Sequence, residues 1–189
     1  MNRQLSFLEE SEQKPECAPL TGQAYHPHGI RVSAAMEVGR AGEYLVMADL
    51  LLEGWVAYPT SQGVPYDIAV DIGPRVVRVQ VKSTRMPKSP QALQRGTPLY
   101  VFHTRRAGKG GRRRYDTDDF DVLALVALDR RLIAYYPLAE CRNDSIAIRV
   151  PGLRYGEGGM QSRYFEDAKF DLALRRVLQS KGQDRVCPR

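Results

Sequence analysis

The stretch VVRVQVKST, Val76–Thr84, alternates valine with polar and charged residues. A period of two residues is typical of a β-strand that buries one of its two faces. The valines would form the buried face, which leaves Gln80 and Lys82 next to each other on the other face. Such a polar face is either solvated or directed at a ligand, and the residues around the strand must decide between these interpretations.

The elements on both sides of this strand predict a mixed α/β domain. A helix is predicted over Ser33–Glu53, because Ser33 can cap its first turn and Gly54 can end it. A second amphipathic helix is predicted over residues 164–180. Further strands are predicted over residues 55–59, 65–73, 98–104, 120–128, 131–137 and 145–150.

The chain of 189 residues is long enough for one domain with its own core. Residues 1–33 are polar, aperiodic and rich in Pro, Glu and Gln, which predicts a flexible N-terminal arm. We expect the folded domain to span residues 34–180 and residues 181–189 to form a loose C-terminal tail.

Composition also restricts the cellular setting. The sequence has no run of 18 apolar residues that could cross a membrane, and its first residues lack the pattern of a signal peptide. The cysteines are few and widely spaced, which predicts a reducing compartment without a disulfide framework or a zinc site: Cys17, Cys141 and Cys187. We therefore expect a cytoplasmic protein.

Basic residues are concentrated in the stretch TRRAGKGGRRRY, Thr104–Tyr115, and the whole chain has a net charge of +6. A dense run of one sign repels itself unless an anion screens it, although such runs are also found as solvated loops. We predict that this run contacts the phosphates of a nucleic acid. The predicted contact residues are Arg105, Arg106, Lys109, Arg112, Arg113 and Arg114.

Two acidic residues stand at unusual positions. Glu43 falls on the same helix stripe as the apolar Val46 and Leu50, where a carboxylate costs free energy unless a cation or hydrogen-bond donors meet it. Asp67 opens the predicted strand YDIAVD. Taken singly, Glu43 could be an exposed boundary residue and Asp67 an ordinary turn residue.

Taken together, four residues predict a hydrolytic site. Two strands joined by a tight turn can bring Asp67, Gln80 and Lys82 onto one face, and a helix packed across them can add Glu43. Carboxylate and amide oxygens suit Mg²⁺, while a lysine can activate a water molecule and offset the charge of a phosphate. This combination predicts metal-assisted attack of water on a phosphodiester.

Three motifs carry a resemblance to a known family: GRAGEY (residues 39–44), VPYDIAVD (64–71) and RVQVKST (78–84). They resemble the PD-(D/E)xK nuclease superfamily and, more narrowly, its group I intron homing endonuclease-like branch, in which the last motif reads QxK. The resemblance extends over about residues 37–138. It implies an α/β fold with a restriction endonuclease-like αβββαβ core, in which helices flank a mixed β-sheet.

The resemblance also implies a role for each site residue. Asp67 matches the first metal-binding acid, Gln80 stands in place of the second acid, Lys82 matches the motif lysine, and Glu43 matches a helix glutamate. The implied metal ligands are Asp67, Gln80 and Glu43, with Mg²⁺ as the cofactor and Mn²⁺ able to replace it. Because the amide of Gln80 is neutral, we expect weaker metal binding than with an acid at this position.

Three functions are compatible with these residues. The first is an Mg²⁺-dependent DNA endonuclease of homing or mobile-element origin, and the second is a Holliday-junction or repair nuclease of the same superfamily. The third is a DNA-binding module without catalysis. The expected partners are double-stranded or branched DNA and further copies of the chain, in a dimer or a tetramer.

A further motif lies in the predicted arm. The segment QLSFL, Gln4–Leu8, resembles the short peptide with which bacterial DNA-processing proteins bind the replication sliding clamp. In such a peptide Leu5, Phe7 and Leu8 would enter apolar pockets while Gln4 forms a hydrogen bond at the rim. The alternative is an apolar segment that packs on its own domain.

Overall fold

The computed structural model describes residues 23–25, 31–61, 63–93, 96–108, 111–141, 143–153 and 163–180. The chain divides into two compact units, Met1–Ala34 and Ala35–Arg189. In the first unit, β1 (Gln23–Tyr25) and β2 (Arg31–Ser33) form a short antiparallel hairpin within the predicted arm. The flexibility of the arm stays a prediction, and the predicted tail lies outside the described residues.

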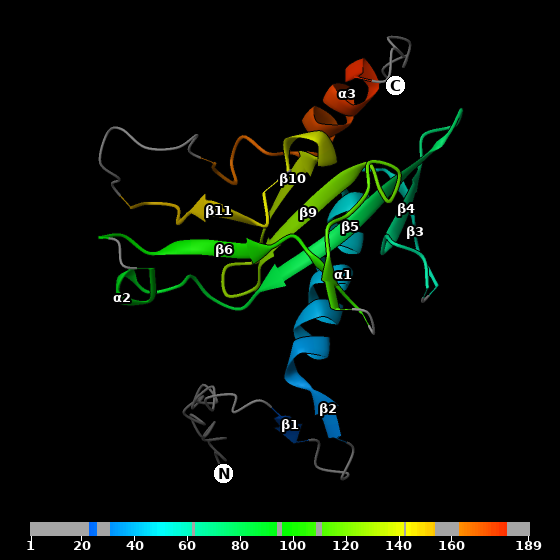
Figure 1. Ribbon diagram of the computed structural model, residues 1–189. Helices are drawn as coiled ribbons and strands as arrows, with labels where there is room; N and C mark the ends of the chain where they lie inside the picture. The colour runs from blue at the N-terminus through cyan, green and yellow to red at the C-terminus, as the bar shows by residue number, and fades with distance from the viewer. Residues whose placement is uncertain are drawn as a thin grey trace, which may run out of the picture. The chain divides into compact units, whose positions relative to one another are not determined.

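A five-stranded sheet with the strand order β10-β9-β5-β4-β3 is the centre of the second unit (Figure 1). Strand β4 pairs antiparallel with both β3 and β5, β9 runs parallel to β5, and β10 returns antiparallel beside β9. The predicted α/β class with a mixed sheet is therefore confirmed. The strands are β3 (Val56–Pro59), β4 (Ile68–Asp71), β5 (Val76–Thr84), β9 (Val122–Ala127) and β10 (Leu132–Pro137).

Two helices cover one face of this sheet. The helix α1 (Ala34–Leu52) and the helix α3 (Phe170–Ser180) share an apolar core with the valine face of β5, as the alternation in the sequence predicted. Trp55, just after α1, packs edge-on against Phe170 of α3, with ring centroids 5.1 Å apart. The helices thereby close the core over Val77, Val79 and Val81.

The closing helix begins at Phe170 rather than at residue 164, so its predicted start is wrong. The preceding residues are used differently: Phe165 and Ala168 are buried in a second apolar cluster, and the carbonyl oxygen of Ala168 accepts a hydrogen bond from the backbone of Tyr135, at 2.7 Å. Pairing with the edge of the sheet therefore replaces the first turns that the sequence pattern predicted.

A second, two-stranded sheet contributes the second apolar cluster. It consists of β6 (Leu99–His103) and β11 (Ser145–Arg149), whose Tyr100 and Ile148 share this cluster with Leu123 of β9. Since all six residues of β9 are buried, both faces of this central strand are covered. A 3-10 turn, η1 (Leu138–Glu140), follows β10.

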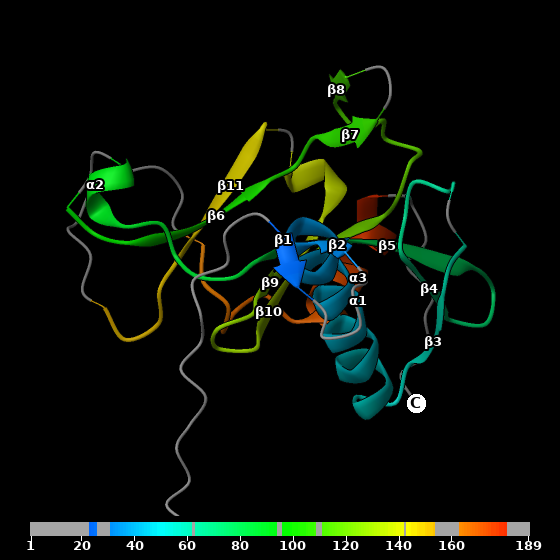
Figure 2. The same cartoon turned by 90° about the horizontal axis from the view of Figure 1, so that it is seen from below.

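The connection from β5 to the parallel strand β9 carries the remaining elements. It contains the four-residue helix α2 (Pro90–Leu93), strand β6 and a short hairpin of β7 (Arg106–Gly108) and β8 (Gly111–Arg113). Figure 2 shows this hairpin projecting beyond the sheets. Within the described part of the chain, no helix combines the length and the apolar character needed to span a membrane.

Candidate active site

A buried glycine lets α1 approach β5 closely. A Cβ atom on Gly42 would lie 1.7 Å from Ser83 Oγ and 2.9 Å from Ser83 Cβ, so a larger residue could not occupy this position without a shift of the helix. In contrast, a Cβ atom on Gly39 would meet nothing within 4 Å. The next residue after this close contact is Glu43, which lies near enough to Asp67, just before β4, for the two charges to interact.

Asp67 is fixed by hydrogen bonds one residue before the start of β4. Its backbone N–H donates to the carbonyl oxygen of Val79 at 2.9 Å, which continues the β4–β5 pairing. Its Oδ2 atom accepts two further hydrogen bonds, from Val81 N at 2.7 Å and from Gln80 Nε2 at 2.5 Å. Two N–H groups of β5 residues thus hold the carboxylate in one orientation.

The orientation of the Gln80 amide follows from its partners. Its Nε2 atom contacts the carboxylate of Asp67 and, at 3.2 Å, the carbonyl oxygen of Val81. Both partners are acceptors only, so the nitrogen must face them and the amide oxygen must point elsewhere. Gln80 is only 8% exposed, and its oxygen is the atom of this side chain that can serve as a ligand to a cation.

The pKa values of both acids of the site are raised. Burial raises the pKa of Asp67 against the opposing effects of the Val81 N–H and the Lys82 charge. Burial also raises the pKa of Glu43, and the negative charge of Asp67 raises it further. Arg40 Nη1 lies 3.4 Å from Glu43 Oε2 and partly offsets this effect. A bound cation would relieve both carboxylates.

Lys82 lies near these acids, but its ammonium group is held by another residue. Lys82 Nζ donates a hydrogen bond to the hydroxyl of Tyr115 at 2.9 Å. Its charge still lowers the pKa of Asp67, although burial outweighs this effect. The structure therefore brings together the four predicted residues Glu43, Asp67, Gln80 and Lys82, and it adds Tyr115, which no sequence pattern indicated.

The oxygen atoms of this site fit a hard divalent cation. The carboxylates of Asp67 and Glu43 and the amide oxygen of Gln80 are ligand types that Mg²⁺ and Mn²⁺ accept. Across the described ranges, no group of three His, Cys, Asp or Glu side chains could hold a metal ion. The candidate site combines the two acids Asp67 and Glu43 with the neutral amide of Gln80.

The predicted DNA-contact residues that the structure describes lie on and beside the β7–β8 hairpin. Arg106 is in β7, Arg112 and Arg113 are in β8, and Arg113 is exposed. Lys109 lies outside the described residues. These residues stay candidates for phosphate contact on a projecting element.

The two arginines at the base of the hairpin share one acidic partner. Arg105 Nη2 donates to Asp144 Oδ2, and Arg114 Nε donates to Asp144 Oδ1 at 3.0 Å. The hydrogen bond from Arg105, followed by that from Arg114, lowers the pKa of Asp144 to about 2. Asp144 therefore stays ionised at neutral pH and offsets part of the positive charge at this point of the chain.

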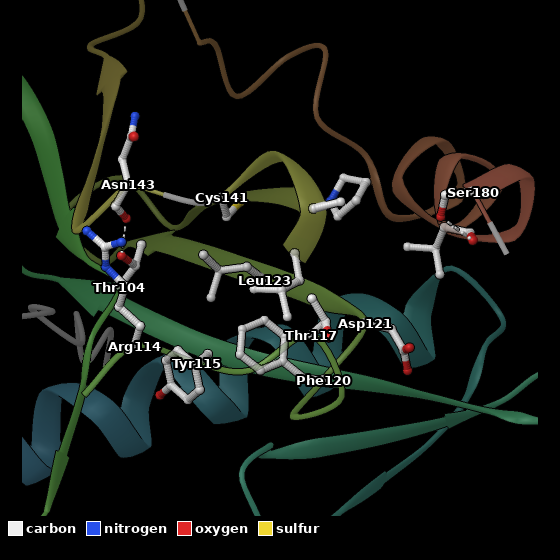
Figure 3. A pocket seen from close by; sticks show the side chains of 14 residues that line it. Thr104, Arg114, Tyr115, Thr117, Phe120, Asp121, Leu123, Cys141, Asn143 and Ser180 are labelled. Atoms are coloured by element: carbon white, nitrogen blue, oxygen red, sulfur yellow. Dashed lines mark hydrogen bonds between the residues drawn. The ribbon is translucent and has the colours of Figure 1, made fainter.

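A cavity of about 530 Å³ has Tyr115 in its lining. Figure 3 shows Tyr115 and Phe120 in its wall, with Cys141 and Ser180 at other points of the lining. The predicted site residues Asp67, Gln80 and Lys82 do not line it. Tyr115 thus lines the cavity and also contacts Lys82 of the candidate site.

Comparisons with known proteins agree with this arrangement. The sequence model described as PD-(D/E)XK endonuclease matches residues 34–172, a range that includes all four predicted site residues. The solved structure of the bacterial homing endonuclease I-Ssp6803I superposes with a TM-score of 0.56 at 17% identity, covering 82% of this chain and 100% of that chain. At this identity the likeness shows the fold, and it confirms the predicted nuclease-like core. No curated protein is a significant match to the chain.

Proposed function

The chain belongs to the PD-(D/E)XK endonuclease family, and from this premise we propose that it is a divalent-metal-dependent endonuclease that hydrolyses phosphodiester bonds in DNA. The observation that carries the proposal is the geometry around Asp67. Two N–H groups fix this carboxylate, its negative charge raises the pKa of the second acid, Glu43, and the charge of Lys82 lowers that of Asp67. Perturbed acids grouped in this way are typical of functional sites.

Each residue has a distinct role in this mechanism. Asp67, Glu43 and the amide oxygen of Gln80 would hold Mg²⁺ or Mn²⁺, whose chemistry when bound is to stabilise the negative charge that develops on the phosphate. The N–H groups of Val81 and Gln80 keep the Asp67 carboxylate in place, so it needs no rearrangement during the reaction. Lys82 orients the attacking water and offsets charge on the scissile phosphate.

Nicking of supercoiled plasmid tests the activity. We expect cleavage in Mg²⁺ or Mn²⁺, no cleavage in EDTA, and no cleavage by Lys82→Ala protein at the same concentration in Mg²⁺. Plasmid that stays intact with the wild-type chain in Mg²⁺, while DNA binding is retained, would identify the chain as a binding module without catalysis.

We propose that the basic hairpin supplies the contacts to the DNA backbone. Changing Arg112, Arg113 and Arg114 to Gln should weaken binding to all sequences and flatten the dependence of affinity on salt by about one unit of slope per lost phosphate contact. Changing Arg175 and Arg176 on α3 is the matched control, since both carry exposed charge on another element. An unchanged salt slope in the hairpin variant would show that the run is only solvated.

We propose that the chain is a homing or mobile-element enzyme that cuts duplex DNA at a defined site. The QxK form of the motif favours this kind of DNA substrate. A panel of linear duplexes and four-way junctions separates this proposal from a junction or repair nuclease.

Cutting both strands of a duplex calls for two active sites, so we propose a homo-oligomer, either a dimer or a tetramer. Light scattering of the protein–DNA complex measures the number of chains, and a single chain per cut duplex would contradict it.

We also propose that the segment Gln4–Leu8, which lies outside the described residues, binds the bacterial sliding clamp. Ordering such a segment costs entropy, so we expect a dissociation constant of about 10 μM. A peptide of residues 1–12 can be titrated against the clamp, with a Gln4→Ala, Phe7→Ala, Leu8→Ala peptide as the control. Equal binding of the two peptides, or none at about 100 μM clamp, would exclude this partner.

A further inference from the structure

Tyr115 lies outside the motifs that define the family resemblance, yet it contacts the motif lysine. The Lys82 ammonium donates to the Tyr115 hydroxyl at 2.9 Å and lies 5.2 Å from the centre of the tyrosine ring. The contact therefore combines a hydrogen bond with a weaker cation–π interaction. These two parts can be separated, because phenylalanine retains the ring and removes only the hydroxyl.

The tyrosine ring is itself held in place from two directions. Phe120, which is 1% exposed, packs edge-on against it with ring centroids 4.8 Å apart and an interplanar angle of 77°. Figure 3 shows the Tyr115 hydroxyl directed away from Phe120. The preceding residue, Arg114, is tied to Asp144 by its 3.0 Å hydrogen bond. The buried Phe120 ring thus holds the Tyr115 ring, and the Arg114 side chain anchors the residue before it.

The Tyr115 hydroxyl is a fixed, neutral hydrogen-bond acceptor for the Lys82 ammonium. An ammonium next to a buried carboxylate tends to form an ion pair with it, and a pair between Lys82 and Asp67 would occupy the carboxylate that a metal needs. Lys82 is close enough to lower the pKa of Asp67, and its ammonium donates a hydrogen bond to the Tyr115 hydroxyl at 2.9 Å. The Tyr115 hydroxyl gives the ammonium a partner that carries no charge.

We propose that Tyr115 is a positioning residue for Lys82. Its hydroxyl holds the ammonium beside Asp67 rather than on it, so that the lysine can meet water and phosphate without moving first. A lysine side chain has several rotatable bonds, and holding it in the reactive position removes this freedom before the substrate binds. The inference rests on the proposed nuclease function, because the benefit is a faster chemical step.

The test compares Tyr115→Phe with wild-type protein in three measurements. Single-turnover cleavage with enzyme in excess should slow by about tenfold. The dissociation constant for uncleaved DNA, measured in Ca²⁺, should stay within about twofold and the melting temperature within about 2 °C, since the ring and its packing on Phe120 are kept. A purely structural role would not separate the rate from the affinity and the stability in this way.

Tyr136→Phe is the matched control. The Tyr136 hydroxyl also forms a hydrogen bond, to the carbonyl oxygen of Tyr164 at 3.0 Å, and its ring also faces a cation, Arg163, at 4.7 Å. It lies outside the proposed site, so its removal should leave the cleavage rate unchanged. An equal slowing in both variants would therefore overturn the inference.

The remaining outcomes are also decisive. An unchanged or faster rate for Tyr115→Phe, with active wild-type protein, would overturn the positioning role alone. A loss of affinity equal to the loss of rate would identify Tyr115 as a DNA contact and overturn it as well. If the wild-type chain does not cleave DNA in any divalent metal, the proposed function fails, and the inference fails with it.

Discussion

Two aspartates contact strand β5, the buried Asp121 and the half-buried Asp67, and their hydrogen-bond partners differ in charge. Asp121 is 5% exposed and accepts hydrogen bonds from the backbone N–H of Arg78 at 2.9 Å and from its Nε at 3.1 Å. Arg75 Nη2 lies 3.7 Å from the same carboxylate. Asp67 receives its hydrogen bonds from neutral groups, the N–H of Val81 and the amide of Gln80.

The charge of the hydrogen-bond partner distinguishes Asp121, a structural acid, from Asp67, the proposed functional acid. The charge of Asp121 is compensated within the fold by a guanidinium, and the same hydrogen bond raises the pKa of Arg78. At Asp67 the neutral donors fix the geometry but do not cancel the charge, and burial raises the pKa. Asp121 is buried and Asp67 is half-buried, so both carboxylates are largely withdrawn from water, and the charge of the partner distinguishes them.

The largest expected effect comes from removing the charge of Asp67 without changing its shape. Asp67→Asn should lower DNA cleavage by about 1,000-fold or more, because one ligand of the metal loses its charge. Plasmid nicking in Mg²⁺ measures the loss, and DNA binding in Ca²⁺ should be largely retained. Cleavage within about tenfold of wild type would place the catalytic acid elsewhere.

The matching change at the other aspartate should have the reverse result. Asp121→Asn leaves Arg78 with a neutral partner, which should lower the free energy of unfolding by about 2 kcal/mol while cleavage by the folded protein persists. Urea unfolding with an unchanged m-value measures the stability. If Asp121→Asn instead abolished cleavage in fully folded protein, the distinction between the two acids would be wrong.

The contact of Asp67 with Gln80 was predictable because it is local. The sequence shows two short strands joined by a Gly-Pro turn, and Gly73 has the positive φ of 89° that such a turn requires. That turn fixes the pairing of Ile68 with Val79, and the pairing places Asp67 beside Gln80. Strand alternation then determines which side chains share a face.

Other features depend on contacts between distant residues, which no local pattern encodes. Lys82 and Tyr115 are 33 residues apart, and Arg114 and Asp144 are 30 residues apart. The choice of Gly42 over the neighbouring glycine at position 39 as the close-contact residue depends on how α1 is rotated against β5. The sequence showed that glycines and a glutamate occur together in this helix, but packing decides which glycine touches the sheet.

A third prediction makes the Asp67 site more acidic. Gln80→Glu would add a charge beside Asp67 and Glu43, so metal binding should tighten by about tenfold while cleavage is retained. The Mg²⁺ concentration that gives half-maximal cleavage measures this change. Loss of all metal-dependent cleavage would show that the amide N–H group of Gln80, which the carboxylate of a glutamate cannot replace, is needed to hold Asp67.

The smallest expected effect is the pH dependence of stability without metal. The pKa values of Asp67 and Glu43 are raised from 3.8 and 4.5, so the folded chain binds these protons more tightly than the unfolded chain. Their contribution to stability is fully present below those ordinary values and is lost as the pH rises through the raised values. Asp144, whose pKa is lowered to about 2, acts in the opposite sense: its contribution is present above 3.8 and is lost as the pH falls through about 2. The two effects therefore occupy different pH ranges.

In EDTA, wild-type protein should lose stability more steeply than Asp67→Asn protein as the pH rises above the ordinary carboxyl values, because the variant has no proton to release at this position. Urea unfolding at a series of pH values measures the slope of stability against pH for both proteins. Comparing the two proteins removes the contribution of acids elsewhere, such as Glu53, whose pKa is also raised by burial.

Mg²⁺ should reduce the slope of the wild-type protein, because a bound cation stabilises the ionised carboxylates. It should leave the slope of the variant nearly unaffected. Asp121→Asn is the matched control, because it removes a carboxylate and leaves the Asp67 site intact. Equal slopes for wild type and Asp67→Asn would mean that Asp67 titrates as it does in the unfolded chain, and the contrast between the two aspartates would then lose its electrostatic basis.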